Sequence, residues 1–230
     1  MKYKNINVFG LGNIGLNIAN LIIYEGLTET VNLVSNQNKN LLEAIKLDLI
    51  NHTPYTKENT NIEIFNSDNF IDADINIVCG GYNIKPTEER IDVLDRNKEW
   101  FDKIISQNMR GNWIVITNPD DYMAKYLLDN SNLTEKNITC LGVSLDSMRA
   151  KHKGINSILK GQHNEQITTI NNESLKKATD IPFEILKHKG FTCYGIGFIV
   201  MWFLKKELMN KKTVISKFNS KNNRFEAIKV

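Results

Sequence analysis

Up to about residue 140, short apolar runs alternate with longer segments in which apolar residues recur every three or four positions. In one such segment Ile14, Ile18, Leu21 and Ile22 fall on one helical face, and Gly26 follows as a stop signal. The pattern therefore predicts strands that are each followed by a helix. The predicted strands are 6–10, 31–34, 61–65, 74–81, 112–119 and 137–143, and the predicted helices are 13–26, 40–50, 90–109 and 122–128.

This alternation indicates the fold class. Strands that alternate with helices form a parallel sheet that is covered by helices on both faces. The run WIVI at 113–116 has no polar residue, as expected for a strand that is buried on both sides. We therefore expect an α/β fold with a Rossmann-type, doubly wound parallel sheet over residues 1–142.

The pattern is less regular in residues 143–230, which we expect to form a second domain. Residues 144–154 have a helical pattern, and 183–208 form a long apolar pattern that predicts one continuous helix. Residues 211–218 predict a strand. The polar segment 165–179 and the final residues receive no assignment.

Composition and charge exclude several classes of function. A hydrophobic fraction of 41% and a charged fraction of 24% are ordinary for a soluble globular protein. The net charge of +3 is small, and no basic run is interleaved with aromatic residues, so we expect no nucleic-acid partner. No apolar stretch has spanning length and the first residues do not resemble a secretory signal, so we expect no membrane partner.

The three cysteines, Cys79, Cys140 and Cys193, indicate a reducing compartment. They are far apart and have neither metal-ligand nor redox-pair spacing. We therefore expect no metal site and a cytoplasmic location.

The first candidate site is GLGNIG, which follows the first predicted strand and opens the first predicted helix. It places Gly10, Gly12 and Gly15 in the G-x-G-x-x-G pattern. The first glycine permits a tight turn, the second lets a pyrophosphate approach the backbone, and the third allows close packing of helix and strand. The strand–loop–helix order favours a dinucleotide site over a glycine-rich turn without a ligand.

The ribose contact expected with this loop is altered. An acidic residue normally ends the second strand, where it binds the ribose hydroxyls. Here Ser35 occupies that position, and Lys39 is the nearest cation. A serine tolerates a 2′-phosphate but lacks the charge of a carboxylate, so the choice between NAD and NADP stays open.

Five further motifs follow in order: DADINIVCGGYNIKPTEERIDVLDRN, TNPDD, GVSLDSMR, GQHNEQ and EILKHKGFTCYGIG. In that order they resemble the strand and mobile active-site loop, the TNPVD turn, the LDSxR helix start, the GEHGDS loop and the late threonine-bearing helix of the lactate/malate dehydrogenase family. The resemblance extends to about Phe218. It implies that residues 143–230 form a truncated α+β substrate domain, shortened both after His163 and at its end.

The resemblance implies the chemistry of 2-oxo acid reduction. By this resemblance, His163 donates the proton and Asp146 orients the imidazole and favours its charged form. Arg149 holds the substrate carboxylate in a bidentate fork, and Arg90 polarises the carbonyl when its loop closes. Individually each residue also has a structural explanation, such as a helix cap for Asp146 or a polar surface position for His163.

Further contacts are implied by the same resemblance. Asn118 and Thr192 match substrate-binding positions, and Ile84 occupies the loop position that recognises the substrate side chain. An isoleucine cannot clamp a second carboxylate, which indicates pyruvate or a bulkier apolar oxo acid rather than a dicarboxylate. The implied cofactor contacts are Gly10, Gly12, Asn13, Ile14, Gly15, Ser35, Gly80, Asn97 and Asn118.

The His163 loop departs from the family motif, because Gln162, Asn164 and Glu165 replace Glu, Gly and Asp. We therefore keep two hypotheses. The first is an NAD-dependent dehydrogenase for a small 2-hydroxy or 2-oxo acid of lactate type, possible as a homo-oligomer like its relatives. The alternative is a catalytically degenerate relative that serves as a binding or structural protein.

Overall fold

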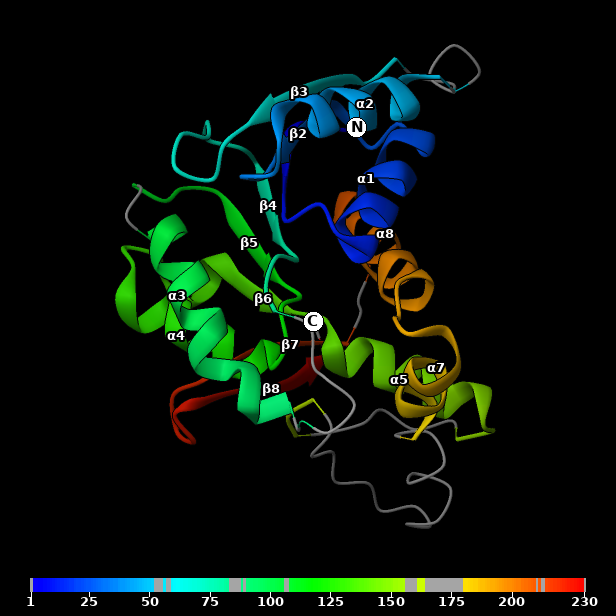
Figure 1. The fold of residues 1–230 in the computed structure, drawn as a ribbon. Helices are drawn as coiled ribbons and strands as arrows, with labels where there is room; N and C mark the ends of the chain where they lie inside the picture. The colour runs from blue at the N-terminus through cyan, green and yellow to red at the C-terminus, as the bar shows by residue number, and fades with distance from the viewer. Residues whose placement is uncertain are drawn as a thin grey trace.

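A single eight-stranded sheet forms the centre of the molecule, in the order β3-β2-β1-β4-β5-β6-β7-β8 (Figure 1). The structure, a computed structural model, describes residues 2–51, 56, 59–82, 88, 90–105, 108–155, 161–163, 180–209, 211 and 214–229, with Arg90 and Lys229 described by their backbones alone. The strands are β1 (Tyr3–Phe9), β2 (Thr28–Val34), β3 (Asn61–Phe65), β4 (Ile75–Val78), β5 (Asn112–Val115), β6 (Ile138–Cys140), β7 (Val214–Asn219) and β8 (Arg224–Lys229). The helices are α1 (Asn13–Tyr24), α2 (Lys39–Ile50), α3 (Leu94–Ile105), α4 (Asp120–Asn130), α5 (Gly142–His152), α7 (Ile181–Lys189) and α8 (Tyr194–Leu208), with the 3-10 turns η2 (Arg90–Val93) and η3 (Glu135–Asn137).

Strands β1 to β6 are parallel, which confirms the α/β, doubly wound expectation. The chain builds β1, β2 and β3 in one direction and β4, β5 and β6 in the other. The order therefore reverses between β1 and β4, and ligands of open α/β sheets bind at such a switch point.

Helices cover both faces of the sheet (Figure 1). On one face α1 and α8 pack together, with Ile18, Ile22 and Val200 fully buried in a shared core. On the other face α3 and α4 contribute Phe101 and Leu127 to a second core around β5. The helices thus hold the sheet rigid on both sides, while its strand ends carry the loops.

The C-terminal segment adds to the same sheet. β7 pairs antiparallel with β6, and β8 pairs antiparallel with β7. The strand predicted at 211–218 is confirmed as β7. β8 was not predicted, although Phe225 and Ala227 alternate with polar residues and Asn223 takes a positive φ of 51° in the turn before it.

Two helix predictions were wrong in extent. The helix expected over 183–208 is divided into α7 and α8, because Gly190 adopts φ 82° and caps the end of α7. In place of the helix expected over 90–109, the chain forms η2 and then α3, which begins at Leu94 and ends at Ile105. Met109 is not helical, since its backbone exchanges hydrogen bonds with the side chain of Asn132. No helix in the described part of the chain is both long enough and apolar enough to span a membrane.

Candidate active site

The predicted site residues gather where the parallel strands end. Gly10 follows β1, Ser35 follows β2, Gly80 comes two residues after β4, and Asn118 lies just beyond β5. Parallel strands present their carboxyl ends at one edge of a sheet, so these residues lie along the same edge. Gly142 opens α5 after β6 and brings Asp146 and Arg149 to the same side.

The three glycines of the first loop have distinct environments. Gly10 has φ 86°, and an added Cβ would lie 2.2 Å from the Cα of Gly80. At Gly15 an added Cβ would lie 2.0 Å from the carbonyl oxygen of Gly10. At Gly12, which precedes the first turn of α1, it would meet no described atom within 4 Å. The first and third glycines are thus required by close packing, whereas the second faces space beside a helix N-terminus, which suits a phosphate group.

Other predicted cofactor residues serve the fold as well. Ser35 is buried, and its Oγ accepts a hydrogen bond from the backbone N–H of Gln37 at 3.3 Å. Asn13 is exposed at the start of α1, and the partly buried Ile14 packs against the core. Their cofactor contacts stay predictions.

Asn97 holds two segments of this edge together. Its Oδ1 accepts from the backbone N–H of Tyr82 at 2.7 Å, and its Nδ2 donates to the carbonyl oxygen of Asn118 at 2.6 Å. The Thr117 hydroxyl donates to the carbonyl oxygen of Gly80 at 2.5 Å. These hydrogen bonds connect the segment after β4 to the segment after β5. The side-chain amide of Asn97 is buried and binds backbone groups of both segments.

His163, Asp146 and Arg149 form a connected group. His163 Nδ1 lies 2.6 Å from Asp146 Oδ2, and Arg149 Nη1 lies 3.1 Å from Asp146 Oδ1. The side chains are 7%, 2% and 10% exposed, respectively. Asp146 and Arg149 are neighbours because three residues make almost one turn of α5. Asp146 thus offers one oxygen to each partner and connects the imidazole to the guanidinium.

Burial perturbs Arg149. Desolvation lowers the pKa of its guanidinium, and the charge of Asp146 acts against that change. Arginine keeps its charge even so, because its ordinary pKa is far above neutrality. The group therefore presents a fixed cation beside the imidazole.

Two further acids were missed by the sequence analysis. Asp120 and Asp121 begin α4, and both are buried. Asp121 Oδ2 accepts a hydrogen bond from the backbone N–H of His163 at 2.6 Å, and Asp120 Oδ2 accepts from the N–H of Gly142 at 2.9 Å. Burial first, and then the charge of Asp120, raise the pKa of Asp121 to about 7. The signal in the sequence was Asp120, the first acid in TNPDD, where the family motif has Val.

Ligand atoms of Asp120, Asp121 and Cys140 lie within 4.8 Å of one another. Burial raises the pKa of the Cys140 thiol well above its ordinary value, so without a bound cation this residue is a neutral thiol.

The structure does not describe every predicted site residue. Ile84, Asn164 and Glu165 lie outside the described residues, as does the side chain of Arg90, whose backbone opens η2. Thr192 is half-buried on the turn between α7 and α8. The next residue ties this turn to α1, because the carbonyl oxygen of Cys193 accepts from Asn17 Nδ2 at 3.1 Å. The substrate contact of Thr192 stays a prediction.

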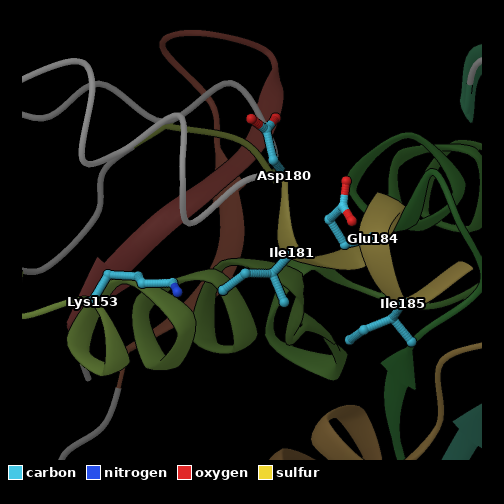
Figure 2. Close-up of a pocket in the computed structure, with 5 residues that line it drawn as sticks. All are labelled: Lys153, Asp180, Ile181, Glu184 and Ile185. Carbon is cyan, nitrogen blue, oxygen red and sulfur yellow. The ribbon is translucent and has the colours of Figure 1, made fainter. Parts of the chain in front are cut away.

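A hollow of about 380 Å³ lies elsewhere, between the end of α5 and the start of α7 (Figure 2). None of the residues that line it is a predicted site residue. They are Lys153, Asp180, Ile181, Glu184 and Ile185.

Comparisons with known proteins agree with this arrangement. The family model for the NAD-binding domain of lactate/malate dehydrogenase matches residues 4–140. L-lactate dehydrogenase 2 of Bacillus cereus is 24% identical over 93% of this chain and 81% of that protein. An L-lactate dehydrogenase of Lactococcus lactis subsp. cremoris is 24% identical over 92% of this chain and 80% of that protein.

Solved structures share the fold. A lactate dehydrogenase from a Medee basin deep-sea metagenome library superposes with a TM-score of 0.83 at 22% identity, covering 100% of this chain and 87% of that one. The minor L-lactate dehydrogenase from Enterococcus mundtii gives a TM-score of 0.80 at 20% identity, covering 94% and 82%.

Proposed function

This chain belongs to the lactate/malate dehydrogenase family, and on that premise we propose that it is an NAD-dependent L-2-hydroxyacid dehydrogenase of lactate type. The family assignment carries a nicotinamide cofactor and oxidoreductase chemistry. The finer proposal rests on one observation: His163 Nδ1 lies 2.6 Å from the buried carboxylate of Asp146, beside the guanidinium of Arg149.

The residues at the glycine loop fit a dinucleotide. The N-terminus of α1 points its N–H groups and positive dipole end at the loop, and a Cβ at Gly12 would be the group that obstructs an approaching phosphate. When bound, the nicotinamide would supply the hydride that reduces C2 of the oxo acid.

The protein's own groups would move the proton and hold the substrate. With Nδ1–H donating to Asp146, the His163 ring is held in one tautomer and its charged form is stabilised. Protonated Nε2 would then donate to the carbonyl oxygen of the oxo acid. Arg149 carries five N–H donors, so its bond to Asp146 is compatible with a fork around the substrate carboxylate.

Substrate preference follows from Ile84, which lies outside the described residues. An isoleucine at the position that recognises the side chain cannot bind a second carboxylate. We expect a higher kcat/KM for pyruvate, or for a larger apolar 2-oxo acid, than for oxaloacetate. Steady-state rates of NADH oxidation on these acids would test this, and a preference for oxaloacetate would refute it.

The alternative function is a binding or structural protein, and the burial of Arg149 against Asp146 favours it, since that pairing directs the guanidinium inward. One pair of measurements separates the hypotheses. Thermal unfolding with NADH and with NADPH detects cofactor binding through a rise in Tm. Turnover on a panel of 2-oxo acids then detects catalysis. Protein that binds NADH but reduces no oxo acid would support the alternative.

A further inference from the structure

A pair of buried carboxylates lies next to His163. Asp120 and Asp121 are each 3% exposed at the start of α4. If a Cβ were added to Gly142, it would lie 2.5 Å from His163 Cγ and 2.6 Å from Asp120 Oδ2. The imidazole and the carboxylate are therefore packed against the same glycine, and only a residue without a side chain fits there.

We propose that Asp121 is a positioning residue for His163, and that the neighbouring carboxylate of Asp120 controls how strongly Asp121 holds the His163 backbone. Asp121 acts through the backbone, since its Oδ2 accepts the His163 N–H at 2.6 Å. Asp146 acts on the ring of the same residue at Nδ1. The catalytic consequence rests on the proposed function, in which His163 donates the proton.

The hydrogen bonds show which carboxylate holds the proton. Asp120 accepts two backbone N–H groups, that of Asp121 at Oδ1 at 3.0 Å and that of Gly142 at Oδ2 at 2.9 Å, and both bonds favour its anion. Asp121 accepts one backbone N–H group, that of His163 at Oδ2, and the Ser216 hydroxyl and the Cys140 thiol lie beside its carboxyl group. Asp121 accepts fewer backbone N–H groups than Asp120, so a proton held by the pair belongs on the carboxyl group of Asp121.

The surroundings favour a neutral Asp121 below about pH 7. Burial and then the charge of Asp120 raise the pKa of Asp121 to about 7, whereas the His163 N–H, the nearby Ser216 hydroxyl and the charge of His163 act in the opposite direction. Cys140 on β6 is a neutral thiol, because burial raises its pKa. The titratable and charged groups around the pair are His163, Asp146 on α5, Cys140 on β6 and Lys217 on β7.

The proton on Asp121 has a consequence for catalysis. An ionised carboxylate accepts an N–H bond more strongly than a neutral carboxyl does. Protonation at acid pH therefore weakens the hold on His163, and small displacements of a catalytic group lower the rate strongly. Oxo acid reduction is expected to fall on the acid side as Asp121 gains its proton, and on the alkaline side as the imidazole loses its own.

The activity test uses Asp120→Asn, which removes one negative charge and keeps an amide oxygen. The acid limb of the kcat/KM profile for pyruvate reduction should move to lower pH by about one pH unit or more. Asp120→Val, which restores the residue of the family motif, should move the limb in the same direction. Asp129→Asn, an exposed position on the same helix, is the matched control and should move neither limb.

A second readout does not require catalysis. In protein labelled with ¹⁵N-histidine, the four histidine amides are distinguished by the signal missing in His163→Gln. The His163 amide should shift with a midpoint near pH 7, at lower pH in Asp120→Asn, and should lose this transition in Asp121→Asn. An acid limb and an amide midpoint that are the same in wild type and Asp120→Asn would overturn the positioning role. The expected amide shifts without any oxo acid reduction would support that role and refute the proposed function instead.

Discussion

The two ends of the candidate site use different parts of the chain. At the glycine loop the functional atoms are backbone, since Gly10, Gly12 and Gly15 contribute no side chain and a helix N-terminus supplies the positive charge. At the His163 end they are buried ionisable side chains, with Asp146 and Arg149 almost inaccessible to solvent. The glycine-loop end therefore depends on backbone geometry, and the His163 end depends on buried charges.

This difference has an energetic meaning. Close-packed glycines take little from the free energy of unfolding in the folded chain. Buried charges lower it unless they are paired and hydrogen bonded. Each carboxylate oxygen of Asp146 has a partner, His163 or Arg149. Asp121 has less compensation for its burial, and its pKa is raised, which favours the neutral carboxyl group. Such groups gather mainly where chemistry uses them, which supports the enzyme hypothesis.

The largest expected effect is a loss of turnover at the His163 end that leaves cofactor binding at the glycine-loop end intact. His163→Gln should lower kcat for pyruvate reduction by a factor on the order of 10²–10⁴, because a general acid is lost. NADH affinity should stay nearly unchanged, since the proposed dinucleotide site lies mainly on the glycine loop. Asp146→Asn should cost less than His163→Gln, because it disturbs only the orientation and charge of the ring. Stopped-flow reduction and calorimetric titration of NADH measure the two properties.

A His163→Gln protein that turns over normally would make His163 a bystander. A variant that loses NADH binding along with turnover would instead show that the two ends do not act independently. His188→Gln, at an exposed helix position, is the control substitution.

The second prediction concerns the backbone geometry of the glycine loop. Gly10→Ala should destabilise the fold by ~1–3 kcal/mol, because φ is 86° and the new Cβ would lie 2.2 Å from Gly80 Cα. Gly12→Ala should leave unfolding nearly unaltered and weaken NADH binding, because its Cβ would enter the space beside the helix N-terminus. Thermal melts with and without NADH separate these effects. Equal destabilisation by both substitutions would contradict the assigned roles.

The first half of the chain was predictable because its pattern is local. The strand–helix alternation and GLGNIG are read within a few residues, and the parallel strands β1 to β6 follow them. The pair His163 and Asp146 was identified only through motif order, since 17 positions separate them and neither shows its partner in its own surroundings.

The rest depends on tertiary contacts. Asp120 and Asp121 look like exposed charges at a helix start, and only contacts with Gly142 and His163 reveal that they are enclosed. The division between α7 and α8 was indicated by Gly190, but the apolar pattern on both sides of it was stronger. Three buried asparagines, Asn7, Asn32 and Asn76, likewise share one register across β1, β2 and β4. Asn32 donates to Asn7 and Asn7 donates to Asn76, which a single strand cannot show.

A smaller effect is expected where charge is added to the glycine-loop end. Ser35→Asp places a carboxylate after β2, where it should tighten NADH by roughly 1–3 kcal/mol and weaken NADPH through repulsion of its 2′-phosphate. Ser35→Ala is the matched control, because it removes the hydroxyl that accepts from Gln37 N–H without adding charge. Calorimetric titration of both cofactors tests this, and unchanged affinities in Ser35→Asp would place the ribose elsewhere.

The smallest expected effect tests whether buried charge distinguishes the His163 end in stability as well. In the unfolded chain Asp121 loses its proton near pH 4, but in the folded chain its pKa is raised to about 7. Between these values the folded state binds the extra proton, so the stability from Asp121 is fully present below about pH 4 and is lost as pH rises through about 7. Asp121→Asn has no such proton, and its Tm should therefore fall less than that of wild type between pH 5 and 8. The expected difference is on the order of 1 kcal/mol per pH unit between pH 5 and 7, and each 1 kcal/mol corresponds to roughly 2–4 °C in a chain of this size. Asp129→Asn, whose carboxylate is exposed, should follow wild type. Parallel dependences of Tm on pH for Asp121→Asn and wild type across this range would mean that Asp121 is already ionised at pH 5, and that its burial does not lower the stability of the His163 end.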